Sequence, residues 1–161
     1  MSAICTMKGG FDMAQAVGTC AGDCRPRASQ ARTIALVGAR APLHLTSLGK
    51  LFLATDSVEN VRLYAQRTGL PGKTPHSLTS LSALEQELDT IRMHDLAYDN
   101  EEAEIGLRCV ASPIRNEEGA IVAALSISSP TDRHNPDWAA QIKETTEDIS
   151  RALGYIQPRG K

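Results

Sequence analysis

Alternation of apolar and polar residues is clearest in the second half of the chain, where it predicts a β-hairpin. In the first strand, the residues at every second position, which would share one face, are Ile105, Leu107, Cys109 and Ala111. The second strand, Ala120–Ser128, is almost continuously apolar. Between the two strands lies Asn116–Gly119, whose residue types favour a turn.

The register of this hairpin decides which side chains face one another. A loop with an even number of residues places Cys109 opposite Ser126 and Leu107 opposite Ser128. A three-residue loop shifts the pairing by one position and places Ile127 opposite Cys109 instead. With the even loop, one thiol and two hydroxyls share one face of an otherwise apolar sheet.

Apolar residues at helical spacing, together with capping residues, predict helices before and after the hairpin. Ser47 is a candidate N-cap for a helix over Leu48–Ala54, and Asp56 is a candidate for a helix that ends at Gly69. A final helix is predicted after Asn135-Pro136-Asp137, where a capping residue precedes a proline and an acid.

Periodicity is strongest in the helix just before the hairpin, where apolar residues recur at Leu81, Leu84, Leu88 and Ile91. Two starts are open for this helix, because Ser82 with Glu85 fits a capping box and Ser80 is an alternative cap. Leu96–Asp99 then predicts a short strand, and residues 100–104 an acidic turn. Short helices beside antiparallel strands predict the α+β class.

The N-terminal residues 1–40 give weaker signals. Phe11–Val17 and Thr33–Val37 are candidate strands with an exposed loop between them. Cys20 and Cys24 lie in this loop without a second closely spaced Cys or His pair, which favours a plain loop over a zinc site.

Composition and charge narrow the range of functions. At 161 residues with 42% hydrophobic residues, the chain has the size and apolar content of one domain with its own core. Its formal net charge is -2 and its cations are scattered, which argues against a surface that holds a phosphate backbone. No stretch approaches the roughly 18 apolar residues that span a bilayer, and the first residues lack signal-peptide features, so we expect a cytoplasmic protein without membrane contact.

Four segments carry a resemblance to a known family: PLHLTSLGKLFLA, LEQELDTIRMHDLAYDNEE, IGLRCVASPIRNEEGAIVAALSISSP and DISRALGY. With these motifs in this order, the chain resembles the C-terminal effector-binding domain of the IclR family of bacterial transcriptional regulators. The resemblance implies a GAF-like α+β fold with a curved antiparallel sheet flanked by helices over residues 41–156. Residues 1–40 match the family poorly, and residues 157–161 are expected to form a tail.

The resemblance also implies a function. The domain would bind a small organic acid and control DNA binding by an attached winged helix-turn-helix. We see no winged-helix segment before the matched region, so we expect this chain alone not to bind DNA specifically. The resemblance further implies a homodimer or homotetramer that is not an enzyme and needs no cofactor or metal.

The ligand-binding residues that the resemblance implies are Leu48, Gly49, Asp99, Leu107, Cys109, Ser126 and Ser128. Residue chemistry agrees with this set. A helix start presents unpaired N–H groups to an anion, and Gly49 would let a carboxylate approach the backbone. Serine hydroxyls can donate to the same ligand, and Asp99 can accept from a hydroxyl on it. We interpret Lys50 as a solvated flank of this helix start.

Other interpretations of the same residues remain open. Cys109 also fits a small buried hydrophobe, Asp99 a turn former and Gly49 a point of close helix packing. A cysteine-dependent enzyme acting on a small carboxylate would use Cys109 as nucleophile and His44 or His94 as base, although no spacing links them. A ligand-free dimerisation module would leave the convergent polar groups without a role.

Overall fold

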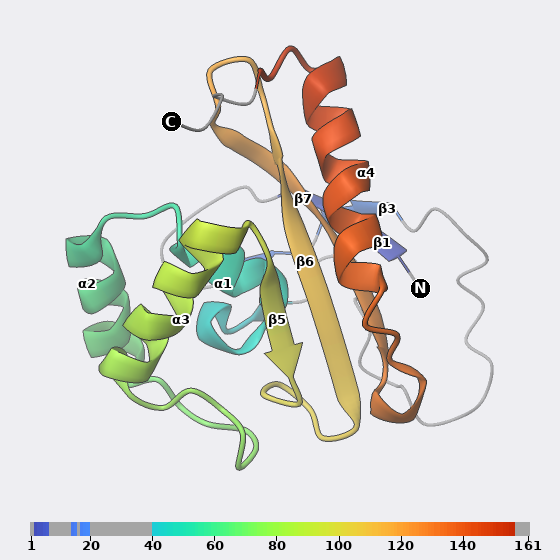
Figure 1. The fold of residues 1–161 in the computed structure, drawn as a ribbon. Helices are drawn as coiled ribbons and strands as arrows, with labels where there is room; N and C mark the ends of the chain where they lie inside the picture. The colour runs from blue at the N-terminus through green and yellow to red at the C-terminus, as the bar shows by residue number, and fades with distance from the viewer. Residues whose placement is uncertain (1, 7–13, 16, 20–39, 157–161) are drawn as a thin grey trace.

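One antiparallel sheet lies between helices, which confirms the α+β class (Figure 1). A computed structural model describes residues 2–6, 14–15, 17–19 and 40–156. The sheet has five strands in the order β3-β1-β7-β6-β5. Their bounds are β1 (Ser2–Thr6), β3 (Val17–Thr19), β5 (Ala97–Asn100), β6 (Leu107–Arg115) and β7 (Ile121–Pro130). A separate pair is formed by β2 (Ala14–Gln15) and β4 (Arg40–Ala41).

The N-terminal predictions are met only in part. Short strands occur at 14–15, within the predicted strand Phe11–Val17, and at 17–19, which begins at its last residue. The predicted strand Thr33–Val37, together with Cys20 and Cys24, lies outside the described residues.

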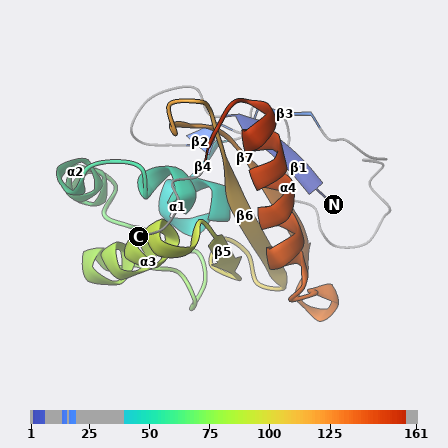
Figure 2. The same ribbon diagram turned by 45° about the horizontal axis from the view of Figure 1, so that its top comes forward.

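Helices cover both faces of the sheet. The last helix, α4 (Trp138–Ala152), lies along β6 and β7 on one face (Figure 1). Helices α1 (Ser47–Leu53) and α3 (Leu81–His94) lie on the other side, and α2 (Val58–Thr68) packs against α3 (Figure 2). The larger core lies on the side of α1, and a smaller core of Val110, Leu125 and Ile142 lies under α4.

Hydroxyl residues cap the first helices, each one position away from the prediction. Thr46 rather than Ser47 caps α1, and Ser57 rather than Asp56 caps α2. Each capping residue is the last one with extended backbone, so its side chain can accept from an N–H in the first helical turn. Neighbouring hydroxyl and acidic residues are equivalent candidates in the sequence, because only the backbone angles distinguish them.

The two later helices start close to the predicted positions. Of the two candidate caps for α3, the cap is Ser80, whose Oγ accepts from the Ala83 N–H at 3.3 Å. Before α4, the Asn135 Oδ1 accepts from the Asp137 N–H at 3.0 Å. A tight turn follows, and the regular helix therefore begins at Trp138.

The hairpin exists as predicted, but its predicted register is wrong by two positions. Arg115 pairs with Ile121, so the loop spans residues 116–120, and a bulge next to Arg115 shifts the ladder once more. Cys109 therefore pairs with Ser128 rather than Ser126, and Leu107 pairs with Pro130 rather than Ser128. Because the shift is even, every side chain keeps its predicted face.

The first strand of the hairpin also starts later than predicted. Ile105 was expected to share a face with Leu107, but it precedes β6 and is 57% exposed. Gly106, which lies between them, has a φ of 83°, and this turn keeps Ile105 out of the extended backbone that begins at Leu107.

Close packing of α1 against the preceding 3-10 turn, Leu43–Leu45, depends on Gly49. A Cβ at position 49 would lie 2.3 Å from the Leu43 carbonyl oxygen and 2.6 Å from the Thr46 Oγ1. The space beside Gly49 is thus filled by the protein's own backbone. This geometry favours the packing interpretation of Gly49 over an approach route for a ligand.

We expect Gly49→Ala to lower the free energy of unfolding by about 1–3 kcal/mol, because backbone must move to admit the methyl group. Urea denaturation measures this change. Gly72→Ala is the matched control, since a Cβ there would meet only side-chain atoms, the nearest being the Thr79 Cγ2 at 3.0 Å. Equal effects of the two substitutions would contradict the packing role of Gly49.

Candidate functional site

The candidate site is a row of polar side chains across three strands. Asp99 on β5 pairs with Cys109 on β6, and Cys109 pairs with Ser128 on β7. The Ser128 hydroxyl donates to the Cys109 Sγ at 3.0 Å. The site residues that the sequence predicted on one face therefore lie side by side, in a pairing the sequence did not give.

The next positions along the same face complete the site. Ser126 pairs with Ala111, one step along the ladder from the row of Cys109, and is 4% exposed. Leu107 is half-buried on the other side of that row. Small side chains, Ala97, Ala111 and Ala124, occupy this face where α1 packs on the sheet, so the helix approaches closely.

Asp99 is both a turn-forming residue and a buried carboxylate. Its Oδ1 accepts from the backbone N–H of Glu102 at 2.8 Å and of Ala103 at 3.3 Å, so the carboxylate shapes the acidic corner after β5. The residue is 2% exposed. Burial raises the pKa of Asp99 to about 6, although the two backbone hydrogen bonds favour the ionised form. The turn-forming interpretation of Asp99 is correct, and it does not exclude contact with a ligand.

A buried cation beside this corner was missed by the sequence analysis. Lys50 on α1, predicted to be solvated, is fully buried. Its Nζ donates to the Glu102 Oε1 at 2.7 Å and to the Glu87 Oε1 at 2.9 Å. Burial raises the pKa of Glu102, and the Lys50 charge acts in the opposite direction. Lys50 thus joins α1, α3 and the corner that Asp99 shapes.

The start of α1 lies beside the candidate site as an apolar surface and does not form an anion-binding site. The Gly49 N–H is already bonded to the Thr46 Oγ1 at 3.1 Å, which removes one of the free donors expected at a helix start. Leu48 is half-buried and packs against the larger core. The geometry therefore places Leu48 and Gly49 next to the sheet face without assigning them a polar contact.

The environment of Cys109 does not suit a nucleophile. Burial raises the pKa of the thiol to about 12, whereas catalytic thiols have pKa values below the usual range. His44, one of the two candidate bases, is buried and bonds the Tyr64 hydroxyl at 2.7 Å and the Pro71 carbonyl at 3.2 Å. Its pKa is lowered by burial. His94, the other candidate, lies exposed at the end of α3.

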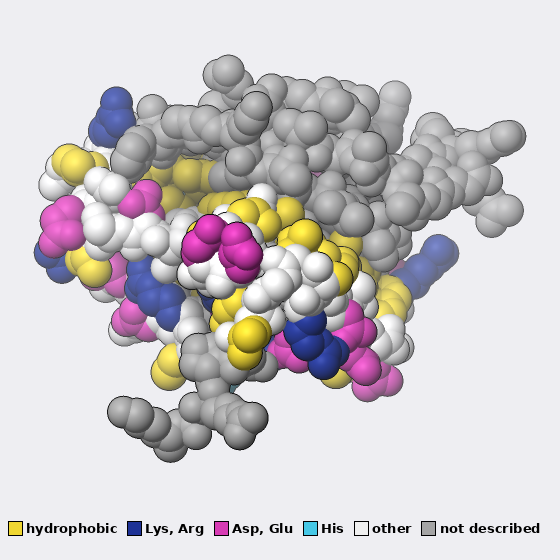
Figure 3. Space-filling model, turned by 90° about the horizontal axis from the view of Figure 1, so that it is seen from above, with side chains coloured by type: hydrophobic (Ala, Val, Ile, Leu, Met, Phe, Trp, Pro, Cys, Tyr) yellow, Lys and Arg dark blue, Asp and Glu magenta, His cyan; other side chains and the backbone are white. Residues whose placement is uncertain are grey.

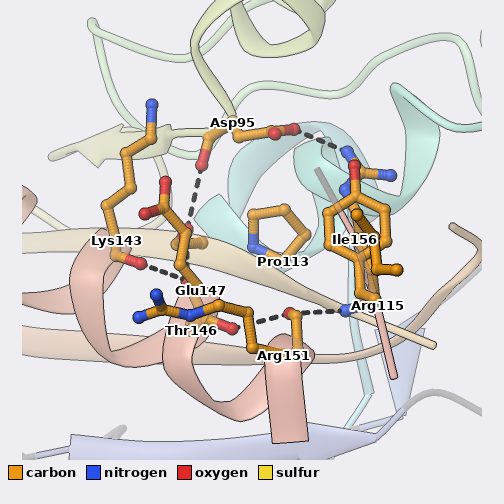
Figure 4. Close-up of a pocket in the computed structure, with 11 residues that line it drawn as sticks. Asp95, Pro113, Arg115, Lys143, Thr146, Glu147, Arg151 and Ile156 are labelled. Carbon is orange, nitrogen blue, oxygen red and sulfur yellow. Dashed lines mark hydrogen bonds and ion pairs between the residues drawn. The ribbon is translucent and has the colours of Figure 1, made fainter. Parts of the chain in front are cut away.

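A cavity of about 350 Å³ lies on the opposite side of the sheet, between α4 and the end of β6 (Figure 4). Its lining includes Arg115, Lys143, Arg151 and Tyr155. Two of the cations there are engaged: the Arg115 Nη2 donates to the Asp95 Oδ1 at 2.7 Å, and the Lys143 Nζ donates to the His94 carbonyl at 3.0 Å. This cavity is separate from the row of Cys109.

Charges are dispersed on the face of the molecule seen from above. In the view from above, the lysine and arginine side chains lie apart from one another and alternate with acids (Figure 3). Within residues 2–6, 14–15, 17–19 and 40–156, no group of three or more His, Cys, Asp or Glu residues has a geometry that would hold a metal ion. In the same part of the chain, no helix is long and apolar enough to span a bilayer.

Comparison with known proteins identifies the family. The family model described as bacterial transcriptional regulator IclR C-terminal matches residues 25–154. The HTH-type transcriptional regulator KdgR of Dickeya chrysanthemi is 36% identical over 128 residues, which are 77% of this chain and 42% of KdgR. The HTH-type transcriptional repressor AllR of Klebsiella pneumoniae is 38% identical over 130 residues, 78% of this chain and 48% of AllR.

A solved structure of a transcription-factor domain agrees with this family. The inducer-binding domain of a double mutant of the PobR transcription factor from Acinetobacter, in complex with 3-hydroxybenzoic acid, has a TM-score of 0.79 at 26% identity. The match covers 95% of this chain and 86% of that one. The chain therefore belongs to the IclR family of bacterial transcriptional regulators and contains its C-terminal domain. It spans about half the length of the curated relatives it matches.

The raised pKa of Asp99 makes a prediction about pH. An acid whose pKa is higher in the folded state binds more protons there than in the unfolded chain, so its contribution to stability falls as pH rises from about 4 to about 6. Asp99→Asn keeps an oxygen that accepts both backbone hydrogen bonds but removes the titration. We therefore expect the variant to gain roughly 2–3 kcal/mol in unfolding free energy relative to the parent between pH 4 and pH 7.

Urea denaturation of both proteins at a series of pH values measures this difference. A difference that stays constant across the range, or that changes in favour of the parent as pH rises, would contradict the burial of an ionisable Asp99.

Proposed function

We propose that this domain senses a small organic acid, which binds over the row formed by Asp99, Cys109 and Ser128. The observation that carries the proposal is the grouping of a carboxylate, a thiol and two serine hydroxyls on one face of the sheet. Such a face, with a few polar groups among small apolar ones, suits a small-molecule ligand. The solved PobR inducer-binding domain in complex with 3-hydroxybenzoic acid supports binding of an organic acid by this type of domain.

The polar groups have complementary roles toward such a ligand. The ligand carboxylate accepts hydrogen bonds from Ser126 and from Ser128, whose hydroxyl turns from the Cys109 Sγ to the ligand, and Asp99 accepts from a hydroxyl or a hydrated carbonyl of the ligand. Cys109 provides a small polarizable surface between them. Leu48, Gly49 and Leu107 form apolar walls. The Gly49 N–H is already used inside α1, so we assign the anion to the serines.

In the intact regulator, the bound acid would act by population shift. An acid that binds one packing of the domain more tightly than another favours that packing, and a dimer or tetramer transmits the change to DNA-binding helix-turn-helix units. This part of the proposal rests on the relatives named as HTH-type regulators and a repressor. The domain would contact DNA only through those units.

Catalysis by Cys109 is the alternative function, and two observations count against it. The thiol, on β6, has a raised pKa, and the relatives named above are transcriptional regulators. A sensor that binds its ligand without converting it agrees better with both.

The proposal predicts that Ser128→Ala weakens binding of the acid about ten- to a hundredfold, because a hydrogen bond to a charged group contributes about 1.5–3 kcal/mol. Calorimetry across a panel of keto, hydroxy and aromatic acids identifies the tightest ligand and measures the loss. The substitution removes one oxygen from a half-buried position, so the fold should persist.

Ser112→Ala is the matched control, because Ser112 is a buried serine of the same sheet that faces α4 and bonds the Thr146 hydroxyl at 2.9 Å. Its affinity for the acid should equal that of the parent. The proposal fails if no acid in the panel binds below millimolar concentration, or if Ser128→Ala binds as tightly as the parent.

A further inference from the structure

A second row of polar side chains crosses the same three strands on the opposite face of the sheet. Asn100 on β5 pairs with Arg108 on β6, and Arg108 pairs with Ser129 on β7. These residues are the sequence neighbours of Asp99, Cys109 and Ser128, so the alternation of a strand turns them toward the side of α4. The two rows lie back to back at one end of the sheet.

The second row contains buried polar atoms that the protein does not satisfy. Among the described residues, five buried side-chain nitrogen or oxygen atoms have no hydrogen-bond partner. Four of them belong to Arg108, Ser129, Thr131 and His134, and these are the Nε, the Oγ, the Oγ1 and the Nδ1, respectively. Buried polar atoms are nearly always bonded to protein, to ordered water or to a ligand, so four orphans in one region mark a place where such a partner can bind.

The backbone brings these residues together. The Thr131 N–H donates to the Gly106 carbonyl at 2.9 Å, which extends the β6–β7 ladder by one step beyond the pair of Leu107 and Pro130. Ser129 is 5% exposed. After the short η2 (Thr131–Arg133), the His134 ring meets the edge of Trp138 with ring centres 5.9 Å apart. Trp138 packs against the smaller core of Val110, Leu125 and Ile142, and Val110 is the next residue of β6 on this face.

The chemistry of the missing partner follows from the donors. The Arg108 Nε–H can only donate, and no carboxylate of the described residues pairs with this guanidinium. The two hydroxyls can donate to the same acceptor. A Cβ built at Gly106, whose carbonyl accepts from the Thr131 N–H, would meet no atom within 4 Å, so there is open space at Gly106. The site therefore needs a small group rich in acceptor oxygens and carrying negative charge.

We propose that Arg108, Ser129 and Thr131, with His134 at the rim, form a binding site for a small oxyanion. The guanidinium binds two of its oxygens in a fork, and the hydroxyls bind the remaining ones. This site is distinct from the acid site proposed above, because it uses the other face of the sheet. A ligand here contacts the same strands as the row of Cys109.

The test is a calorimetric titration of the full chain with inorganic phosphate, and a titration with chloride at the same ionic strength is the reference. We expect saturable binding in the parent and a loss of at least about tenfold in affinity for Arg108→Gln. Arg133→Gln is the matched control, because Arg133 is exposed in η2 and makes the same change in charge. Its affinity for phosphate should equal that of the parent.

Ser129→Ala decides the question if Arg108→Gln fails to fold, and it should also weaken phosphate binding about tenfold. Acetate in place of phosphate distinguishes a carboxylate from a phosphate ligand. The proposal is overturned if the parent shows no saturable binding, if Arg133→Gln loses as much affinity as Arg108→Gln, or if Ser129→Ala binds as tightly as the parent. It is also overturned if Arg108→Gln abolishes self-association without affecting phosphate, since a second copy would then supply the acceptor.

Discussion

The register of the β6–β7 hairpin is the constraint on which the rest of this structure depends. Pairing of Cys109 with Ser128 aligns the polar residues of three strands into a row that faces α1. The same pairing aligns Arg108 with Ser129 on the other face. A shift by one residue would exchange the two faces and leave charged and hydroxyl groups against the apolar core.

The buried ion pairs of Lys50 hold in place the helices and the corner that lie next to the polar row. The ammonium group ties α1 to Glu87 of α3 and to Glu102 in the corner after β5. Removal of one member of such a pair leaves an uncompensated buried charge, which is costly. Asp99 is fixed through the same corner, because it accepts the Glu102 N–H. The site is therefore supported by electrostatic contacts behind it as well as by the strand ladder.

The sequence predicted the elements whose signals are local. The α3 helix, the hairpin turn and the start of α4 each carry capping, turn or periodic residues within a few positions of one another. The shared face of Cys109, Ser126 and Ser128 was also predictable, because alternation survives an even shift in register.

Other features depend on contacts that the sequence does not display. The bulge beside Arg115 is set by how the strands twist and pack, so the pairing of Cys109 was predicted wrongly. Burial of Lys50 depends on Glu87 and Glu102, which are 37 and 52 positions away. In a helix of seven residues, a charged position among apolar ones looks like a solvent-facing one. The role of Gly49 likewise depends on the backbone of Leu43, which only the folded chain brings near.

A cross-strand disulfide tests the register most directly. With Cys5, Cys20 and Cys24 replaced by serine, Cys109 is the only thiol of the chain, and a second one is introduced by Ser128→Cys or by Ser126→Cys. The Cys109 Sγ and the Ser128 Oγ lie 3.0 Å apart, so mild oxidation should join Cys109 to the introduced thiol in Ser128→Cys. It should leave Ser126→Cys reduced, because its new thiol stands one diagonal step away. Rapid closure in Ser126→Cys and none in Ser128→Cys, measured by mass spectrometry of the intact chain, would contradict the register and both rows built on it.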